Sequence, residues 1–188
     1  STSFDGVNDY GVLGSNSDID DLSGVTFCWW QKTNSLGGGS YARIFDKVYT
    51  TVIQLNGTSN NDNGGTSSEI RFGVTTGGTN IAAMSHIGFP HGIWNFCTVT
   101  WAGTIGSSPS GVKIYRNAVE DTDINVSGTP SGSRTSDAGS AAFLGNRAAA
   151  DRCVDGYLAE FTIFDSVLSA SQIRTLYDAA VGKRGVAV

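Results

Sequence analysis

Short segments with alternating apolar residues, separated by glycine-rich and polar turns, constrain the fold most strongly. Val25 to Lys32 is typical, because both of its alternating faces carry an aromatic side chain, which predicts a central strand covered on both sides. About eleven to thirteen such segments occur, and only one segment, near the end, has helical periodicity. The pattern predicts an all-β chain, a two-sheet antiparallel jelly-roll sandwich with one short C-terminal helix.

The closing segment, Asp155 to Tyr177, changes from strand to helix periodicity. Ser169 and Gln172 have the spacing of a capping box, which predicts where the helix begins. We expect a single domain over residues 1–181 and a flexible tail over residues 182–188. One face of the preceding strand is expected to hold Tyr157, Ala159, Phe161 and Ile163, and one face of the helix Ile173, Leu176, Tyr177 and Ala180.

The composition disfavours several classes of partner. A net charge of −5 argues against nucleic acid and against an anionic membrane surface. No apolar run is long enough to span a membrane, so no membrane insertion is expected. The chain enters a strand pattern directly with no secretory signal, and we expect it outside the cell or on a particle surface.

Three cysteines are present, and two readings of them stay open. Cys28 and Cys97 lie within predicted strands and Cys153 near the last one, so free thiols that fill the core are the main expectation. A bridge between Cys28 and Cys97 is the alternative, which sequence alone cannot test.

Four stretches in order resemble the laminin-G-like, concanavalin-A-like jelly-roll domains. They are Phe4 to Tyr10, the strand pair Trp94 to Trp101 and Val112 to Asn117, Leu144 to Arg147, and Asp155 to Tyr177. The resemblance covers nearly the whole chain and implies the sandwich fold. Such domains include sugar-binding modules, adhesion domains, appendages of secreted enzymes and domains on virus particles, so the fold leaves the function open.

The resemblance also implies one structural calcium ion near the sandwich rim, with oxygen ligands from turns. Only one carboxylate stands where relatives carry an acidic pair, at Ala159-Glu160, which weakens the motif. The alternative is that Asp5 and Asp155 only shape Asp-Gly turns. The candidate metal ligands are Asp5, Asn8, Asp9, Asp155 and Glu160.

A sugar-binding surface would need exposed aromatic rings and side chains that form hydrogen bonds with hydroxyl groups. Trp30 has the opposite phase to Phe27 and Trp29, so we expect it to be partly exposed, whereas the other tryptophans are expected in the core. The candidate ligand-binding residues are Trp30, Tyr41, Tyr49, Asn60, Asn61 and Asn63.

No catalytic constellation is evident. The three glutamates, Glu69, Glu120 and Glu160, lie in distant segments, and no strand pairs two carboxylates as a glycosidase needs. The His, Tyr, Arg and Gln cluster of lyases with this fold is not evident either. We therefore expect no enzyme and weigh two hypotheses. One is a lectin-like module that binds carbohydrate or a surface protein, and the other is a structural protein that forms a homo-oligomer or a larger assembly such as a virion or surface layer.

Overall fold

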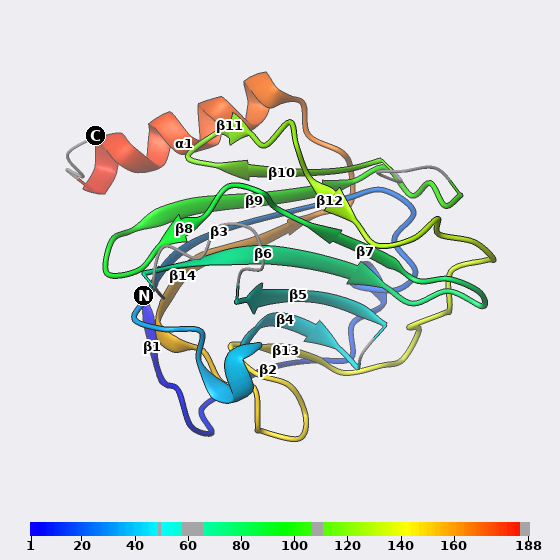
Figure 1. Cartoon of the computed structure of the whole chain (residues 1–188), viewed down its shortest axis with the longest axis horizontal. Coiled ribbons are helices and arrows are strands. Elements are labelled where there is room, and N and C mark those ends of the chain that lie inside the picture. Colours follow the sequence, from blue (N-terminus) through cyan, green and yellow to red (C-terminus); the bar gives the residue numbers. More distant parts are fainter. Residues whose placement is uncertain (49, 58–65, 107–110, 185–188) are drawn as a thin grey trace.

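The computed structural model describes residues 1–48, 50–57, 66–106 and 111–184, and Figure 1 shows their arrangement. Two antiparallel sheets face each other, and one helix, α1 (Ala170–Arg184), lies along the six-stranded sheet. In spatial order the six-stranded sheet contains β1 (Thr2–Asp5), β14 (Asp155–Phe164), β3 (Val25–Thr33), β9 (Asn95–Trp101), β10 (Val112–Arg116) and β11 (Val119–Glu120).

The eight-stranded sheet forms the other half of the sandwich, and the whole confirms the predicted fold class. Its order is β12 (Asn125–Val126), β7 (Ile81–Met84), β6 (Ser67–Val74), β5 (Thr51–Asn56), β4 (Arg43–Lys47), β13 (Ala142–Leu144) and β2 (Gly11–Gly14), while β8 (Phe89–Pro90) pairs with β6. Two single-turn 3₁₀ helices, η1 (Ser17–Ile19) and η2 (Gly38–Ser40), lie in the loops.

The main core fills the space between the sheets. Phe27 of β3 meets Phe45 of β4 and Phe72 of β6, with ring centroids 5.2 and 6.2 Å apart. Trp29 and Trp101 are also buried here. Aromatic side chains that interdigitate in this way hold the sheets together through buried area and ring packing.

A second core lies between the six-stranded sheet and α1, and it corrects the expectation for Trp30. Trp30 points to the outer face of β3, as its phase predicted, but it is only 1% exposed because α1 covers it. Its ring lies 6.0 Å from Tyr177 of α1 and 5.4 Å from Phe96 of β9. The Ser169–Gln172 capping box forms as predicted and begins the helix.

The prediction that alternate residues from Tyr157 to Ile163 share one face of β14 is wrong, because a β-bulge interrupts the strand. Ala159 pairs with Trp30 and Thr162 with Cys28, so β14 has one extra residue, and Glu160 takes a φ of +53°. Ala159 therefore faces α1, whereas Phe161 packs into the core between the sheets. A bulge reverses the phase of every later side chain, and alternation alone does not reveal it.

The boundaries shift slightly from those predicted. The helix continues through Arg184, so the predicted tail from residue 182 is wrong at its start, and residues 185–188 lie outside the described part. Among the described residues, no helix is both long and apolar enough to span a membrane. Three two-residue strands, β8, β11 and β12, are too short for a periodicity argument.

The three cysteines are free thiols, which confirms the main expectation. Cys28 belongs to the core under α1, whereas Cys97 belongs to the core between the sheets. Because the two side chains lie on opposite faces of one sheet, the alternative bridge is excluded. Burial raises the pKa of the Cys28 thiol to about 11, so it stays protonated at neutral pH.

Candidate functional site

A straight row of long side chains crosses the outer face of the eight-stranded sheet. Directly paired residues of neighbouring strands share a face, and this register continues over five strands. Successive strands lie about 4.8 Å apart, so the row is about 19 Å long. It consists of Arg43 on β4, Gln54 on β5, Arg71 on β6, Met84 on β7 and Asn125 on β12.

A parallel row of small side chains lies next to it and makes the face hollow. Val52 of β5 pairs with Gly73 of β6, and Gly73 pairs with Ala82 of β7. One hollow of about 120 Å³ lies over Val52, Gly73 and Arg71, and another of about 190 Å³ lies over Ala82, Met84 and Arg71. Arg71 lines both hollows, and the two hollows together are termed the groove.

Two guanidinium groups converge in this groove. The amide oxygen Oε1 of Gln54 accepts hydrogen bonds from Nη1 of Arg43 and, at 3.4 Å, from Nη1 of Arg71. Asp46 balances Arg43, because its Oδ2 lies 3.3 Å from Nε of Arg43. Burial lowers the pKa of both arginines, and for Arg43 the positive charge of Arg71 adds to that effect.

An aromatic pair stands at the β2 end of the same face. Phe143 of β13 pairs with Asp46 of β4, so it continues the row of Val52 and Gly73. Its ring meets Tyr10 edge to face at 6.0 Å, and Tyr10 is 51% exposed. Exposed aromatic rings of this kind offer flat apolar surface beside polar groups.

The loop residues expected to bind ligand do not form one site. Tyr41 is exposed, with the Arg152 guanidinium 5.5 Å from its ring centroid, and it remains available for a ligand. Trp30 is buried under α1 on the far sheet and cannot contribute. The other four, Tyr49, Asn60, Asn61 and Asn63, lie outside the described residues.

Four of the five expected calcium ligands lie close together, and Glu160 lies apart from them. Asp5 pairs directly with Asp155 across β1 and β14, and the turn after Asp5 holds Asn8 and Asp9. Oδ1 of Asp5 accepts the backbone N–H of Val7 at 2.8 Å, and these turn hydrogen bonds, the Val7 one first, lower the Asp5 pKa. Asp9 likewise accepts the N–H of Asp5. Asn8, in the same turn, donates its backbone N–H to Asp5.

Asp155 also holds a neighbouring loop. Its two carboxylate oxygens accept hydrogen bonds from Asn34 and Ser35 at 2.9 and 2.7 Å. Glu160 lies five residues farther along β14, about 16 Å by strand rise, and lines a hollow beside α1. The described residues contain no group of three or more His, Cys, Asp or Glu side chains placed to hold a metal, and the Asp5 and Asp155 carboxylates already accept hydrogen bonds from turns and loops, so a calcium site here stays a prediction.

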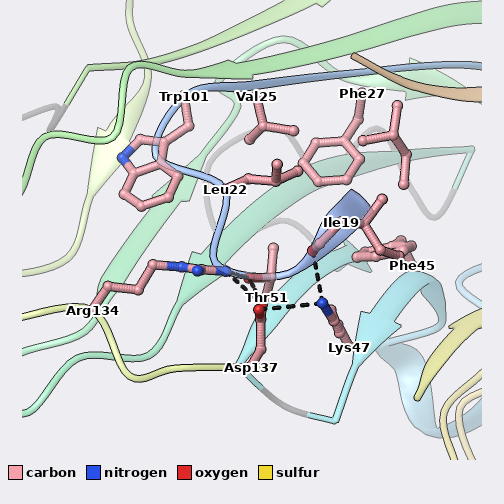
Figure 2. A pocket seen from close by; sticks show the side chains of 11 residues that line it. Ile19, Leu22, Val25, Phe27, Phe45, Lys47, Thr51, Trp101, Arg134 and Asp137 are labelled. Atoms are coloured by element: carbon pink, nitrogen blue, oxygen red, sulfur yellow. Dashed lines mark hydrogen bonds and ion pairs between the residues drawn. The ribbon is translucent and has the colours of Figure 1, made fainter. Parts of the chain in front are cut away.

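A buried ionic cluster at one end of the sandwich was missed by the sequence analysis, and Figure 2 shows it. Asp137 and Lys47 are each 1% exposed, with Nζ of Lys47 3.3 Å from Oδ1 of Asp137 and 2.7 Å from the carbonyl oxygen of Ile19. Arg134 also contacts Asp137 and Thr51. The adjoining cavity, below Phe27 and Trp101, has only about 10 Å³, about enough for one water molecule.

This cluster attaches two loops to β4 and β5. Asp21 and Asp137 exchange backbone-to-carboxylate hydrogen bonds of 2.8 and 2.9 Å, and Asp20 accepts from Lys47. The Lys47 hydrogen bond lowers the Asp20 pKa, and the Asp137 N–H lowers the Asp21 pKa. Stabilisation from these two groups is therefore present at neutral pH and is lost as the pH falls through their lowered pKa values.

Catalytic arrangements on the outer face are incomplete. The carboxylates there, Asp46 and Glu69, are separated by two strands and four residues, about 16 Å between backbone positions, too far for a glycosidase pair. The structure does bring Arg43 and Arg71 together with Gln54. Sequence reasoning did not predict this, because the register of the strands determines which residues become neighbours. In the described part of the groove lining, no His or Tyr accompanies them.

The sequence and the fold were compared with known proteins. A family model described as the concanavalin A-like lectin/glucanases superfamily matches residues 5–174. No curated protein matches the chain. Among solved structures, the native heptameric SAP-like pentraxin of Limulus polyphemus superposes with a TM-score of 0.58 at 13% identity, over 92% of this chain and 83% of the pentraxin chain.

Two other similar structures are parts of larger proteins. Domain 4 of AbnA, a GH43 extracellular arabinanase from Geobacillus stearothermophilus solved in complex with arabinotriose, has a TM-score of 0.58 and 19% identity, over 88% of this chain and 71% of that one. The binding domain of Paraclostridial Mosquitocidal Protein 1 has a TM-score of 0.63 and 14% identity, over 91% of this chain and 41% of that one. At such identities the likeness shows the fold alone.

Proposed function

Because this chain belongs to the concanavalin A-like lectin/glucanase superfamily, we propose that it is a non-catalytic module that binds carbohydrate through the outer face of its eight-stranded sheet. The observation that supports this most is the groove around Arg71, which has a floor of small residues and a wall of guanidinium and amide groups. Binding sites are typically concave, with a few polar groups that converge. The proposed setting is extracellular or on a particle surface.

Side chains in the groove suit a saccharide. Guanidinium groups and the Gln54 and Asn125 amides offer donors and acceptors for hydroxyl groups, and the Tyr10–Phe143 pair offers apolar surface for a sugar ring. Several similar structures, such as that from Paraclostridial Mosquitocidal Protein 1, are binding domains, and the arabinanase domain was solved with an oligosaccharide. These relatives support a binding role, and the groove supports its location.

Filling the groove tests the proposal. Ala82→Leu adds apolar bulk over the hollow of about 190 Å³, so we expect it to weaken glycan binding about tenfold or more without unfolding the domain. A broad glycan-binding screen identifies a bound sugar, and titration calorimetry compares the variants. The matched control, Ala179→Leu on the exposed surface of α1, is expected to bind as the unmodified protein does.

Two results would contradict the proposal. One is a screen in which no saccharide binds. The other is a bound saccharide whose affinity is equal in the Ala82→Leu and Ala179→Leu proteins, because the ligand would then lie elsewhere.

A second candidate function, assembly into a larger structure, is favoured by the β2 edge. Within the described part of the chain, β2 pairs with β13 alone, and large apolar side chains near it are exposed. Val7 is 66% exposed, Val12 62% and Leu13 45%. An apolar strand edge is a surface that another chain can cover.

Solution mass tests the assembly role. If this edge joins copies, light scattering after size-exclusion chromatography shows association that grows with concentration, and Val12→Glu restores the monomer. A monomer at every concentration would leave no support for assembly of this chain with itself.

A further inference from the structure

Resting on the proposed function, we infer that the groove selects sugars with an anionic group, a carboxylate or a sulfate, and that Arg71 is the residue that binds this group. Arg71 lines both hollows, so a sugar that occupies either hollow places a substituent near its guanidinium. The chain as a whole has a net charge of −5, so its composition does not indicate that this one site prefers an anionic ligand.

The charges in the groove do not balance. Among the described residues, no carboxylate lies within ion-pair distance of Arg71, which donates a 3.4 Å hydrogen bond to Gln54. Asp46, the nearby acid, pairs with Arg43 instead. Glu69 lies two residues away on β6 and forms no ion pair with Arg71. Two guanidinium groups thus share one amide oxygen and one carboxylate.

An anion would improve this arrangement for a physical reason. Two like charges directed at the same acceptor repel each other, and both are partly removed from water, which strengthens the repulsion. A carboxylate or sulfate beside Arg71 would replace repulsion with attraction and accept hydrogen bonds from the planar guanidinium. A neutral hydroxyl would do much less.

The strand register gives the anionic group and the other sugar units different positions in the groove. The wall of the groove continues from Arg71 to Met84 and Asn125, whereas the floor beside it is apolar and small. A chain of sugar units along this wall would meet one dominant cation, at Arg71, with Arg43 behind Gln54. Recognition would therefore depend on one anionic group near the middle of the ligand.

Three oligosaccharides and three proteins test the inference. The probes are an oligogalacturonate, a sulfated galactan oligosaccharide and a neutral galactan oligosaccharide, titrated into the intact chain by calorimetry. We expect at least one acidic probe to bind about tenfold or more tighter than the neutral one. Arg71→Gln is expected to abolish this preference, because it weakens binding of the acidic probes about tenfold or more beyond any loss of affinity for the neutral probe. Arg174→Gln, which removes the same charge from α1, should retain the preference.

The outcomes distinguish a carboxylate from a sulfate as the bound group, and they distinguish failure of this inference from failure of the proposed function. Preference for the oligogalacturonate alone assigns a carboxylate, and preference for the sulfated sugar alone assigns a sulfate. Equal binding of acidic and neutral probes, or a preference that survives Arg71→Gln, overturns the inference but leaves a neutral-sugar module intact. Binding of none of the three also overturns it, whereas the proposed function then stands or falls with the broad screen and the Ala82→Leu variant.

Discussion

Replacing Asp137 with asparagine is expected to destabilise the domain by about 3 kcal/mol or more. Asp137 is 1% exposed and contacts Lys47 and Arg134, so the neutral amide removes the buried counter-ion that these cations share and leaves them the more exposed Asp20 and Asp21. Breaking a buried ion pair from one side costs about 3–5 kcal/mol, and the remaining partners place this variant at the lower end of that range. Urea denaturation, monitored by tryptophan fluorescence at neutral pH, measures the difference in unfolding free energy.

An exposed pair supplies the control. Asp178→Asn removes the partner of Arg174 on α1, where both side chains are more than half exposed, and is expected to change stability by about 0.5 kcal/mol or less. If Asp137→Asn unfolds at the same urea concentration as Asp178→Asn, the cluster in Figure 2 does not hold the loops as described.

Replacing Trp30 with alanine is expected to cost about 3–5 kcal/mol and to loosen α1 from the sheet. The indole is 1% exposed and packs on Phe96 and Tyr177, so its removal leaves a large cavity between β3 and the helix. Denaturation curves give the loss of stability, and amide hydrogen exchange of α1 shows whether the helix opens first.

Tyr157→Ala is the matched control for the same outer face. Tyr157 is 40% exposed, so its loss is expected to cost about 1 kcal/mol or less. A Trp30→Ala protein that is as stable as the Tyr157→Ala protein but no longer binds sugar would contradict the account and restore Trp30 as a ligand residue.

Much of the fold could be predicted because local patterns determine it. The two-faced alternation of β3 and the Ser169–Gln172 cap depend on neighbouring residues, and both were predicted correctly. The bulge at Glu160 could not be predicted, because the backbone there leaves the regular pleat without a change in composition. The exposure of Trp30 depended on where α1 packs, which is a long-range fact.

The candidate site was harder to predict than the fold. Arg43, Gln54 and Arg71 come from three strands, and only the register of those strands places them side by side. Arg71 alternates with Ile70 and Phe72, which are buried in the core, so the apolar residues on either side were a partial signal that Arg71 faces outward. The expectation of loop residues followed the richness of the loops in Asn, Gly and Ser, which reflects turns as readily as ligand contacts.

The central claim is that the outer face of the eight-stranded sheet is the ligand surface, and amide chemical-shift mapping tests it most directly. Titrating the sugar identified by the screen into ¹⁵N-labelled protein is predicted to shift amides of Gln54, Arg71, Gly73 and Ala82 together, while α1 stays unchanged. Shifts confined to other surfaces, such as the loop around Tyr41 or the β2 edge, with the groove amides unmoved, would contradict the claim.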